Sequence, residues 1–108
     1  MKFHDKFDTS HLEGTEKKIA DKIVSVLSEG AKTGGCRPFY SVEEWEDRGE
    51  QYGTSSELIV VHDGGDHARY FNMDYMDYKS VEEMNEALFE IGYYAEQCTS
   101  WYSAIYKV

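Results

Sequence analysis

The 108-residue sequence predicts a single α+β domain, residues 1–108, built on a four-stranded and mainly antiparallel sheet with helices packed on one face. Apolar side chains recur at helical spacing over residues 16–29 and again over residues 81–91. Residues 58–61, Leu-Ile-Val-Val, form a short β-branched run, and residues 101–108 alternate as a strand does. An apolar fraction of 41% is sufficient for one hydrophobic core in a chain of this length. The predicted order of elements is α-α-β-β-α-β-β.

The first predicted helix runs from about Glu16 to Glu29 and carries an apolar stripe opposite its charged side chains. Thr15 is its expected N-cap, and Gly30 is expected to end it. The stripe consists of Ile19, Ile23, Val26 and Leu27.

A capping box, Ser41-Val42-Glu43-Glu44, opens the second predicted helix, because Ser41 and Glu44 can satisfy each other's backbone N–H groups. Trp45 anchors this short helix, and Gly49 lies near its end. Its exposed side carries four acidic residues, Glu43, Glu46, Asp47 and Glu50.

A β-hairpin is expected after this helix, with residues 58–61 as its first strand. Asp63-Gly64-Gly65-Asp66 forms its turn, since glycine adopts positive φ at little cost and aspartate bonds its own backbone. Residues 67–73 are the expected return strand, and residues 74–78 either extend it or form a loop.

The third predicted helix begins at a second capping box, Ser80-Val81-Glu82-Glu83, and ends before Gly92. One side of this helix is apolar, and the opposite side carries Glu82, Glu83, Glu86 and Glu90. Two strands follow, residues 93–97 and 101–108, joined by residues 98–100.

The charge of the chain is concentrated in its centre. Residues 41–96 contain fifteen acidic and three basic residues, whereas the flanks contain six acidic and eight basic ones, for a total of −10. Such a field steers association with partners rather than folding. It disfavours direct binding to nucleic acid or to anionic membranes, and it favours basic protein surfaces or metal cations. Because no apolar run is long enough for a membrane span and residues 1–8 lack a signal-peptide core, we expect a cytoplasmic protein.

Catalytic motifs are not apparent, and no cofactor is expected. The string His62-Asp63-Gly64-Gly65-Asp66-His67 has two interpretations: a structural hairpin turn, or a metal site formed by the two histidines and two aspartates. Cys36 and Cys98 are expected to be free thiols in a reducing compartment, with a disulfide between them as the alternative. No glycine-rich phosphate loop lies between a strand and a helix.

Nine tyrosines form a second signal, and sheet packing accounts for most of them. Tyrosine is also enriched in protein interfaces as a rigid anchor. Tyr75 and Tyr78, which adjoin Asp74 and Asp77, are therefore predicted to bind a partner.

The row Glu82, Glu86 and Glu90 places like charges four residues apart, which destabilises the helix slightly. Four residues of helix rise about 6 Å, a spacing comparable to that of successive phosphates on a nucleic-acid strand. In size, acidity and lack of catalytic motifs the chain resembles small phage-encoded inhibitors of bacterial defence, such as anti-CRISPR and DNA-mimic anti-restriction proteins. This resemblance is one of class, and it assigns no role to any single residue.

The sequence thus favours a non-enzymatic inhibitor that occupies a basic, nucleic-acid-binding surface of a partner protein. The predicted contact residues are the four exposed acids of the second helix, the four glutamates of the third, and Asp74, Tyr75, Asp77 and Tyr78. The alternative is a small metal-binding protein or metal-dependent enzyme that uses His62, Asp63, Asp66 and His67.

Overall fold

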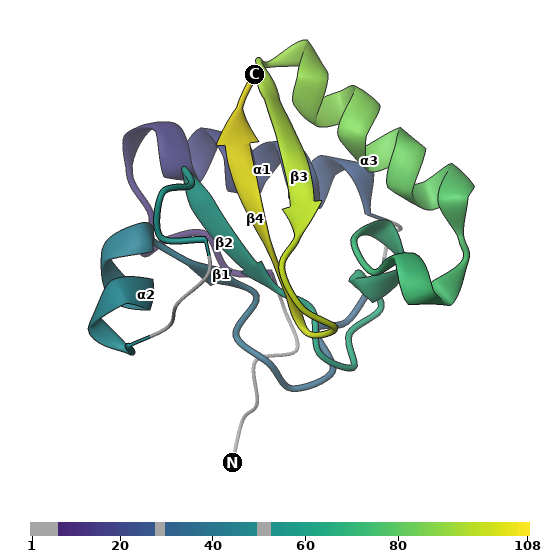
Figure 1. The fold of residues 1–108 in the computed structure, drawn as a ribbon, viewed down its shortest axis with the longest axis horizontal. Coiled ribbons are helices and arrows are strands. Elements are labelled where there is room, and N and C mark those ends of the chain that lie inside the picture. Colours follow the sequence, from purple (N-terminus) through teal and green to yellow (C-terminus); the bar gives the residue numbers. More distant parts are fainter. Residues whose placement is uncertain (1–6, 28–29, 50–52) are drawn as a thin grey trace.

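A computed structural model describes residues 7–27, 30–49 and 53–108, and it confirms an α+β fold with a four-stranded antiparallel sheet (Figure 1). The strand order is β1-β2-β4-β3, and every neighbouring pair is antiparallel. The elements are α1 (Gly14–Val26), β1 (Phe39–Tyr40), α2 (Val42–Asp47), β2 (Leu58–Val61), the 3₁₀ turns η1 (Ala68–Tyr70) and η2 (Met73–Tyr75), α3 (Tyr78–Glu90), β3 (Tyr93–Gln97) and β4 (Tyr102–Lys107). No helix among these residues is both long and apolar enough to span a bilayer.

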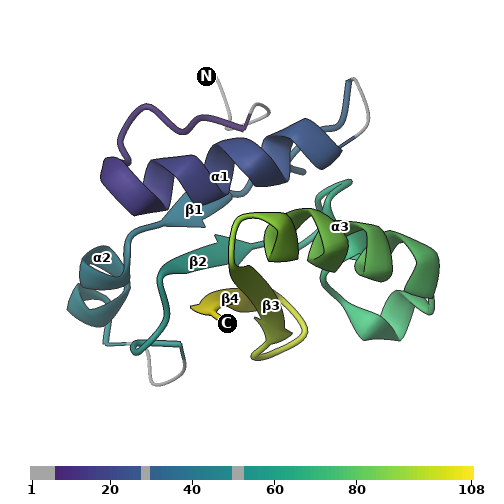
Figure 2. The same ribbon diagram turned by 90° about the horizontal axis from the view of Figure 1, so that it is seen from above.

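The two long helices, α1 and α3, pack against each other and cover one face of the sheet (Figure 2). Ile19 and Ile23 of α1 and Met84 and Leu88 of α3 are fully buried there. They meet the side chains that alternate toward this face, including Leu58, Val60 and Ile105. Lys22 of α1 also forms an ion pair with Glu90 of α3, with Nζ and Oε1 2.8 Å apart.

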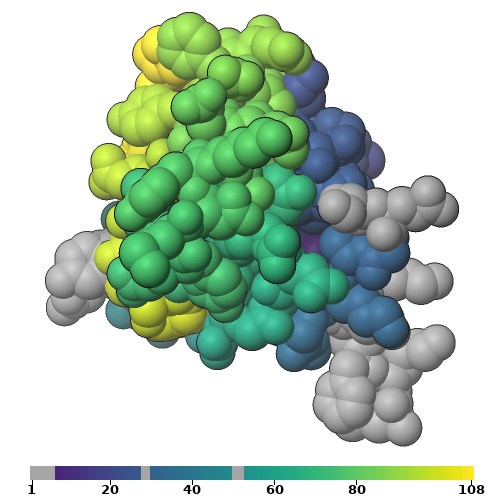
Figure 3. Space-filling view, turned by 90° about the vertical axis from the view of Figure 1, so that its right-hand side faces the viewer, coloured from purple at the N-terminus to yellow at the C-terminus, as the bar shows by residue number. Residues whose placement is uncertain are grey.

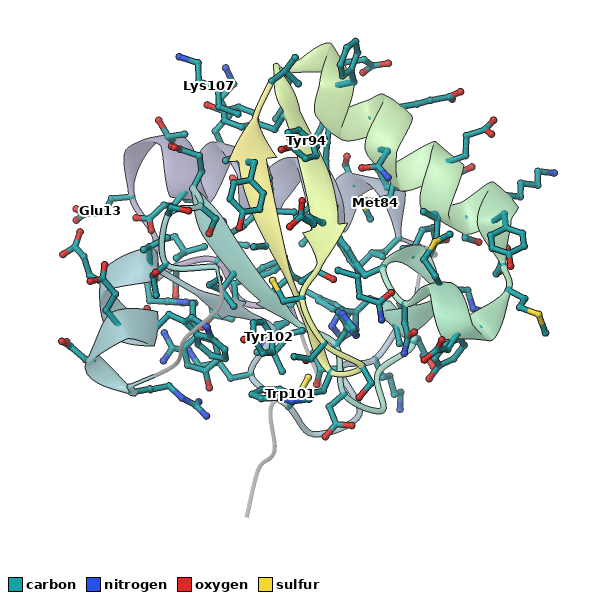
Figure 4. All side chains as sticks on the ribbon, in the orientation of Figure 1. Glu13, Met84, Tyr94, Trp101, Tyr102 and Lys107 are labelled. Carbon is teal, nitrogen blue, oxygen red and sulfur yellow. The ribbon has the colours of Figure 1, made fainter. Side chains whose placement is uncertain are left out.

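The short helix α2 supports the other face of the sheet. Trp45 is fully buried and packs with the residues of opposite alternation, Ile59, Val61, Tyr102 and Ala104. In Figure 4, Tyr102 and Trp101 lie at one end of this face, and Tyr94 lies further along β3. Tyr94 stacks on Tyr106 at 5.8 Å between ring centroids.

The capping box of α2 is confirmed, because Ser41 accepts a hydrogen bond from the Glu44 N–H and the Glu44 carboxylate accepts one from the Ser41 N–H. The N-cap predictions for the other two helices are wrong. Helix α1 begins at Gly14 with Glu13 in the N-cap position, and it ends at Val26, short of the predicted end near Glu29, because Leu27 is extended. Helix α3 begins at Tyr78, where Asp77 rather than Ser80 is the N-cap.

The return strand predicted at residues 67–73 is also wrong. These residues form the 3₁₀ turn η1 and the approach to η2, and the N–H groups of Ala68, Tyr70 and Phe71 each bond a carbonyl three residues back. Strand β2 pairs instead with β4 on one side and with the two-residue β1 on the other. The predicted strands β3 and β4 and the left-handed Gly92 that precedes them are confirmed.

Candidate protein-binding surface

The structure divides the predicted acidic surface into two patches. Helix α2 and helix α3 lie at opposite ends of the long axis of the molecule in both ribbon views (Figures 1 and 2). Glu43, Glu46 and Asp47 are exposed on α2, and the predicted Glu50 lies outside the described residues. The eleven predicted contact residues that the structure describes therefore do not form one continuous face.

Two arginines lie beside the acidic residues of α2. The Arg37 guanidinium binds the Glu44 carboxylate at 2.7 Å and stacks over the Tyr40 ring at 4.4 Å. The Arg48 guanidinium stacks over the Trp45 ring at 4.9 Å. These cations reduce the negative potential at this end of the molecule.

Helix α3 carries the other acidic patch, with Lys79 exposed in its first turn, and η2 and α3 occupy much of the face seen in Figure 3. Glu82, Glu83 and Glu86 are exposed, and none of the three forms an ion pair within the part of the chain that the structure describes. Glu90 differs, because Lys22 neutralises it. The row of like charges is thus shorter than the sequence predicts.

The acidic patch adjoins a group of exposed apolar side chains at the start of α3. We define the η2–α3 corner as residues 73–78. Met73 is 45% exposed, Tyr75 52%, Met76 71% and Tyr78 57%. Sequence reasoning found Tyr75 and Tyr78 but missed the two methionines, which begin the two repeats Met73-Asp74-Tyr75 and Met76-Asp77-Tyr78.

Hydrogen bonds fix the backbone of this corner. The Asn72 side-chain oxygen accepts from the Asp74 N–H at 2.9 Å and from the Gln97 amide at 3.0 Å. The Asn72 amide donates to the Ser100 carbonyl at 3.1 Å, and the Gln97 side-chain oxygen accepts from the Met73 N–H at 3.0 Å. The corner is thereby tied to β3 and to the β3–β4 turn.

Asp74 and Asp77 serve the corner in different ways. Asp74 is exposed, and its carboxylate forms no hydrogen bond or ion pair with another of the described residues. Asp77 caps α3, accepting from the Ser80 N–H at 3.2 Å and from the Ser80 hydroxyl at 2.9 Å. Hydrogen bonds from Ser80 lower the pKa of Asp77, so this carboxylate stays charged at neutral pH.

Met76 has the one left-handed backbone conformation recorded for a residue other than glycine in the described chain, with φ of 54°. This conformation costs an ordinary residue roughly 1–2 kcal/mol. It ends η2 and reverses the chain before Asp77 begins α3. The surrounding structure therefore keeps Met76, the most exposed methionine, in a strained conformation at the tip of a turn.

The candidate metal residues do not converge. His62 and His67 are fully buried, whereas Asp63 and Asp66 are exposed. Asp66 instead joins two loops, since its carboxylate accepts from the Lys32 N–H at 2.9 Å. Within the described residues, no three histidine, cysteine, aspartate or glutamate side chains are placed to hold a metal ion.

The two histidines support the fold. His67 Nε2 lies 2.7 Å from the Val61 carbonyl, which can only accept, so Nε2 carries the proton and the buried Nδ1 has no partner. The Gly65 backbone lies so close to that atom that a Cβ on residue 65 would be only 2.4 Å from Nδ1, so only glycine fits there. Burial lowers the pKa of His62 to about 4, and His67 adds to that effect. Both rings are therefore neutral at pH 7, and His62 bonds the Ser103 hydroxyl at 3.0 Å.

The cysteines offer no activated nucleophile. Both are free, and burial raises the pKa of Cys36 to about 11 and raises that of Cys98 as well. A thiol that stays protonated at neutral pH is a poor nucleophile. The exposed surface of η2 and α3 is therefore the strongest candidate site of the described chain. Comparison with known proteins found no matching family model, curated protein or solved structure.

Proposed function

We propose that this protein is a non-enzymatic binding protein whose α3 surface docks onto a basic, nucleic-acid-binding surface of a partner protein and excludes nucleic acid from it. One observation supports this most strongly. Glu82, Glu83 and Glu86 are exposed and form no ion pair within the described chain, directly beside an exposed apolar corner.

Carboxylates on a helix can substitute for phosphates in contacts with arginine and lysine. Glu82 and Glu86 are separated by about 6 Å of helix rise, which is close enough to the phosphate repeat for neighbouring basic side chains to bind both. An unpaired row of this kind costs helix stability at i,i+4 spacing. A partner that supplies the opposite charges would offset that cost.

The geometry limits the size of the proposed contact. Glu90 already binds Lys22, and the acidic residues of α2 lie at the far end of the molecule. The α3 patch therefore imitates a few phosphates and not a long duplex. We propose that it blocks part of a nucleic-acid-binding groove, in a contact that weakens as salt rises.

The resemblance to phage-encoded anti-defence proteins indicates which partners to test first. These are restriction and CRISPR complexes of bacteria, which hold nucleic acid in basic grooves. We propose that the protein acts in the cytoplasm, where its two free cysteines would stay reduced.

The test compares two charge reversals of equal size. One variant carries Glu82→Lys, Glu83→Lys and Glu86→Lys on α3, and the other carries Glu43→Lys, Glu46→Lys and Asp47→Lys on α2. Each exchanges three exposed acids for lysines, so their net charges are identical. Each protein is immobilised, incubated with bacterial lysate at low salt and eluted with a salt gradient, and the eluted proteins are identified by mass spectrometry.

We expect nucleic-acid-binding proteins to elute from the wild-type protein and from the α2 variant but not from the α3 variant. An exposed ion pair contributes about 0.2–1 kcal/mol. Losing three of them should weaken binding by about 0.6–3 kcal/mol, or roughly 3- to 150-fold. A purified partner should then release a fluorescent DNA duplex when wild-type protein is added. Equal loss in both variants would show that only net charge matters, and it would refute a docking site on α3.

A further inference from the structure

We propose that the η2–α3 corner binds the apolar face of a basic amphipathic segment, one that presents leucine-like side chains beside lysine or arginine. This inference rests on the proposed function, because it adds an apolar contact to the acidic one on α3. It also identifies the chemistry of the partner more closely than charge alone.

The corner concentrates the exposed apolar surface of the molecule. Seven large hydrophobic side chains of the described residues are strongly exposed, and four of them lie within residues 73–78. The other three, Phe89, Tyr94 and Val108, are distributed between the end of α3 and the β3–β4 hairpin. A local concentration of this kind is typical of an interaction site.

The corner is rigid in its backbone and adaptable in its side chains. Asn72 and Gln97 hold its main chain, so little conformational entropy is lost there on binding. Methionine is unbranched and polarisable, and it adjusts to the shape of an apolar partner surface. Met73 and Met76 therefore complement the stiffer rings of Tyr75 and Tyr78.

The charges around the corner are mixed, with acids in excess. Asp74 and Asp77 lie between the apolar residues, and Glu82 lies one turn of α3 beyond Tyr78, with Glu83 and Glu86 further along the helix. Two exposed cations, Arg69 and Lys79, lie close enough to Asp77 to lower its pKa. Because these five acids outnumber the two cations, an acidic partner segment would be repelled and cationic side chains would be attracted. The complementary surface is apolar at its centre with cationic side chains at its rim.

The test uses two synthetic peptides of equal positive charge. One is an amphipathic helix of leucine and lysine, and the other replaces every leucine with glutamine. Fluorescence anisotropy gives the dissociation constant of each peptide at several salt concentrations for four proteins. These are the wild type, Tyr75→Ala/Met76→Ala, the α3 charge-reversal variant, and the control Tyr94→Ala on the far face of the sheet (Figure 4).

We expect the wild type to bind the leucine peptide at least tenfold more tightly than the glutamine peptide. The corner variant should lose this preference, and Tyr94→Ala should retain it. The α3 variant should bind both peptides more weakly while keeping a preference for leucine. Unchanged thermal unfolding of the corner variant would show that its effect is not a loss of folding, since both side chains are more than half exposed.

Two results would overturn this inference. The first is a leucine preference that survives in Tyr75→Ala/Met76→Ala, and the second is a wild-type dimer in sedimentation that this variant abolishes, which would assign the corner to self-association. Failure of the proposed function looks different. In that case the α3 variant would bind both peptides as the wild type does.

Discussion

Asn72→Ala should destabilise the protein strongly, because the side chain of Asn72 is only 6% exposed and makes three hydrogen bonds at the η2–α3 corner. Each such bond contributes about 0.5–1.5 kcal/mol net. The upper limit for three bonds is about 4.5 kcal/mol. Because water can reach part of this region, we expect the free energy of unfolding to fall by about 2–3 kcal/mol. For a domain of 108 residues, 1 kcal/mol corresponds to roughly 4 °C. The melting temperature should therefore fall by about 8–12 °C.

The matched control is Asn85→Ala on α3. Asn85 makes a single recorded bond, accepting from the outward N–H of Ala95 on the edge strand β3 at 2.9 Å, and alanine is the better helix former. Its melting temperature should fall by about 4 °C or less. Circular dichroism measures both shifts, and hydrogen exchange should accelerate at Tyr75 and Met76 in Asn72→Ala alone. Equal shifts for the two variants would refute the conclusion that Asn72 holds the corner.

Three further substitutions or conditions test the account of the fold. Burial lowers the pKa of His62 to about 4, so the unfolded chain binds more protons than the folded one between pH 6.5 and about 4. Urea titrations should therefore show the free energy of unfolding falling by up to about 1.4 kcal/mol per pH unit from His62 as the pH falls, and the lowered pKa of His67 acts in the same direction; constant stability from pH 7 to 4.5 would contradict this. Gly65→Ala would place a Cβ 2.4 Å from the His67 ring, and it should cost about 1–3 kcal/mol in the same assay, whereas a change below about 0.5 kcal/mol would show that the site is not tightly packed. Met76→Gly removes a left-handed strain at φ of 54°, so its melting temperature should equal or exceed that of the wild type while it binds the leucine peptide more weakly; a lower melting temperature would assign Met76 a structural role.

Local signals in the sequence predicted most of the fold. The capping box at Ser41 and Glu44, the β-branched run of β2 and the final hairpin all depend on neighbouring residues, and all are confirmed. Strand β1 could not be predicted in this way. It has two residues, and only its pairing with β2 across the intervening helix α2 defines it.

The segment after β2 shows why its local pattern misled. The turn at residues 63–66 suggested a hairpin, but His67 bonds back to Val61 and its ring is enclosed by Phe7 and Gly65. These contacts direct the chain into η1. The pairing position beside β2 is occupied by β4, more than forty residues later, which no local pattern specifies.

The candidate site was predictable in composition but not in arrangement. Charge counting identified the acids of α2 and α3, yet only the fold places them at opposite ends of the sheet. The ion pair of Lys22 with Glu90 joins residues far apart in sequence, and it shortens the acidic row. The methionines of the corner were missed because exposed apolar residues are indistinguishable from core residues until burial is known.

Backbone amide chemical shifts measured during titration with the leucine–lysine peptide would test the central claim most directly. They report each residue separately, so they distinguish docking at one surface from diffuse attraction to an acidic protein. We predict that the largest changes fall on residues 73–78 and on the solvent side of α3 around Glu82 and Glu86, with little change on α2. Changes that are largest on α2 or on the open sheet face around Tyr94 would contradict a binding surface formed by η2 and α3.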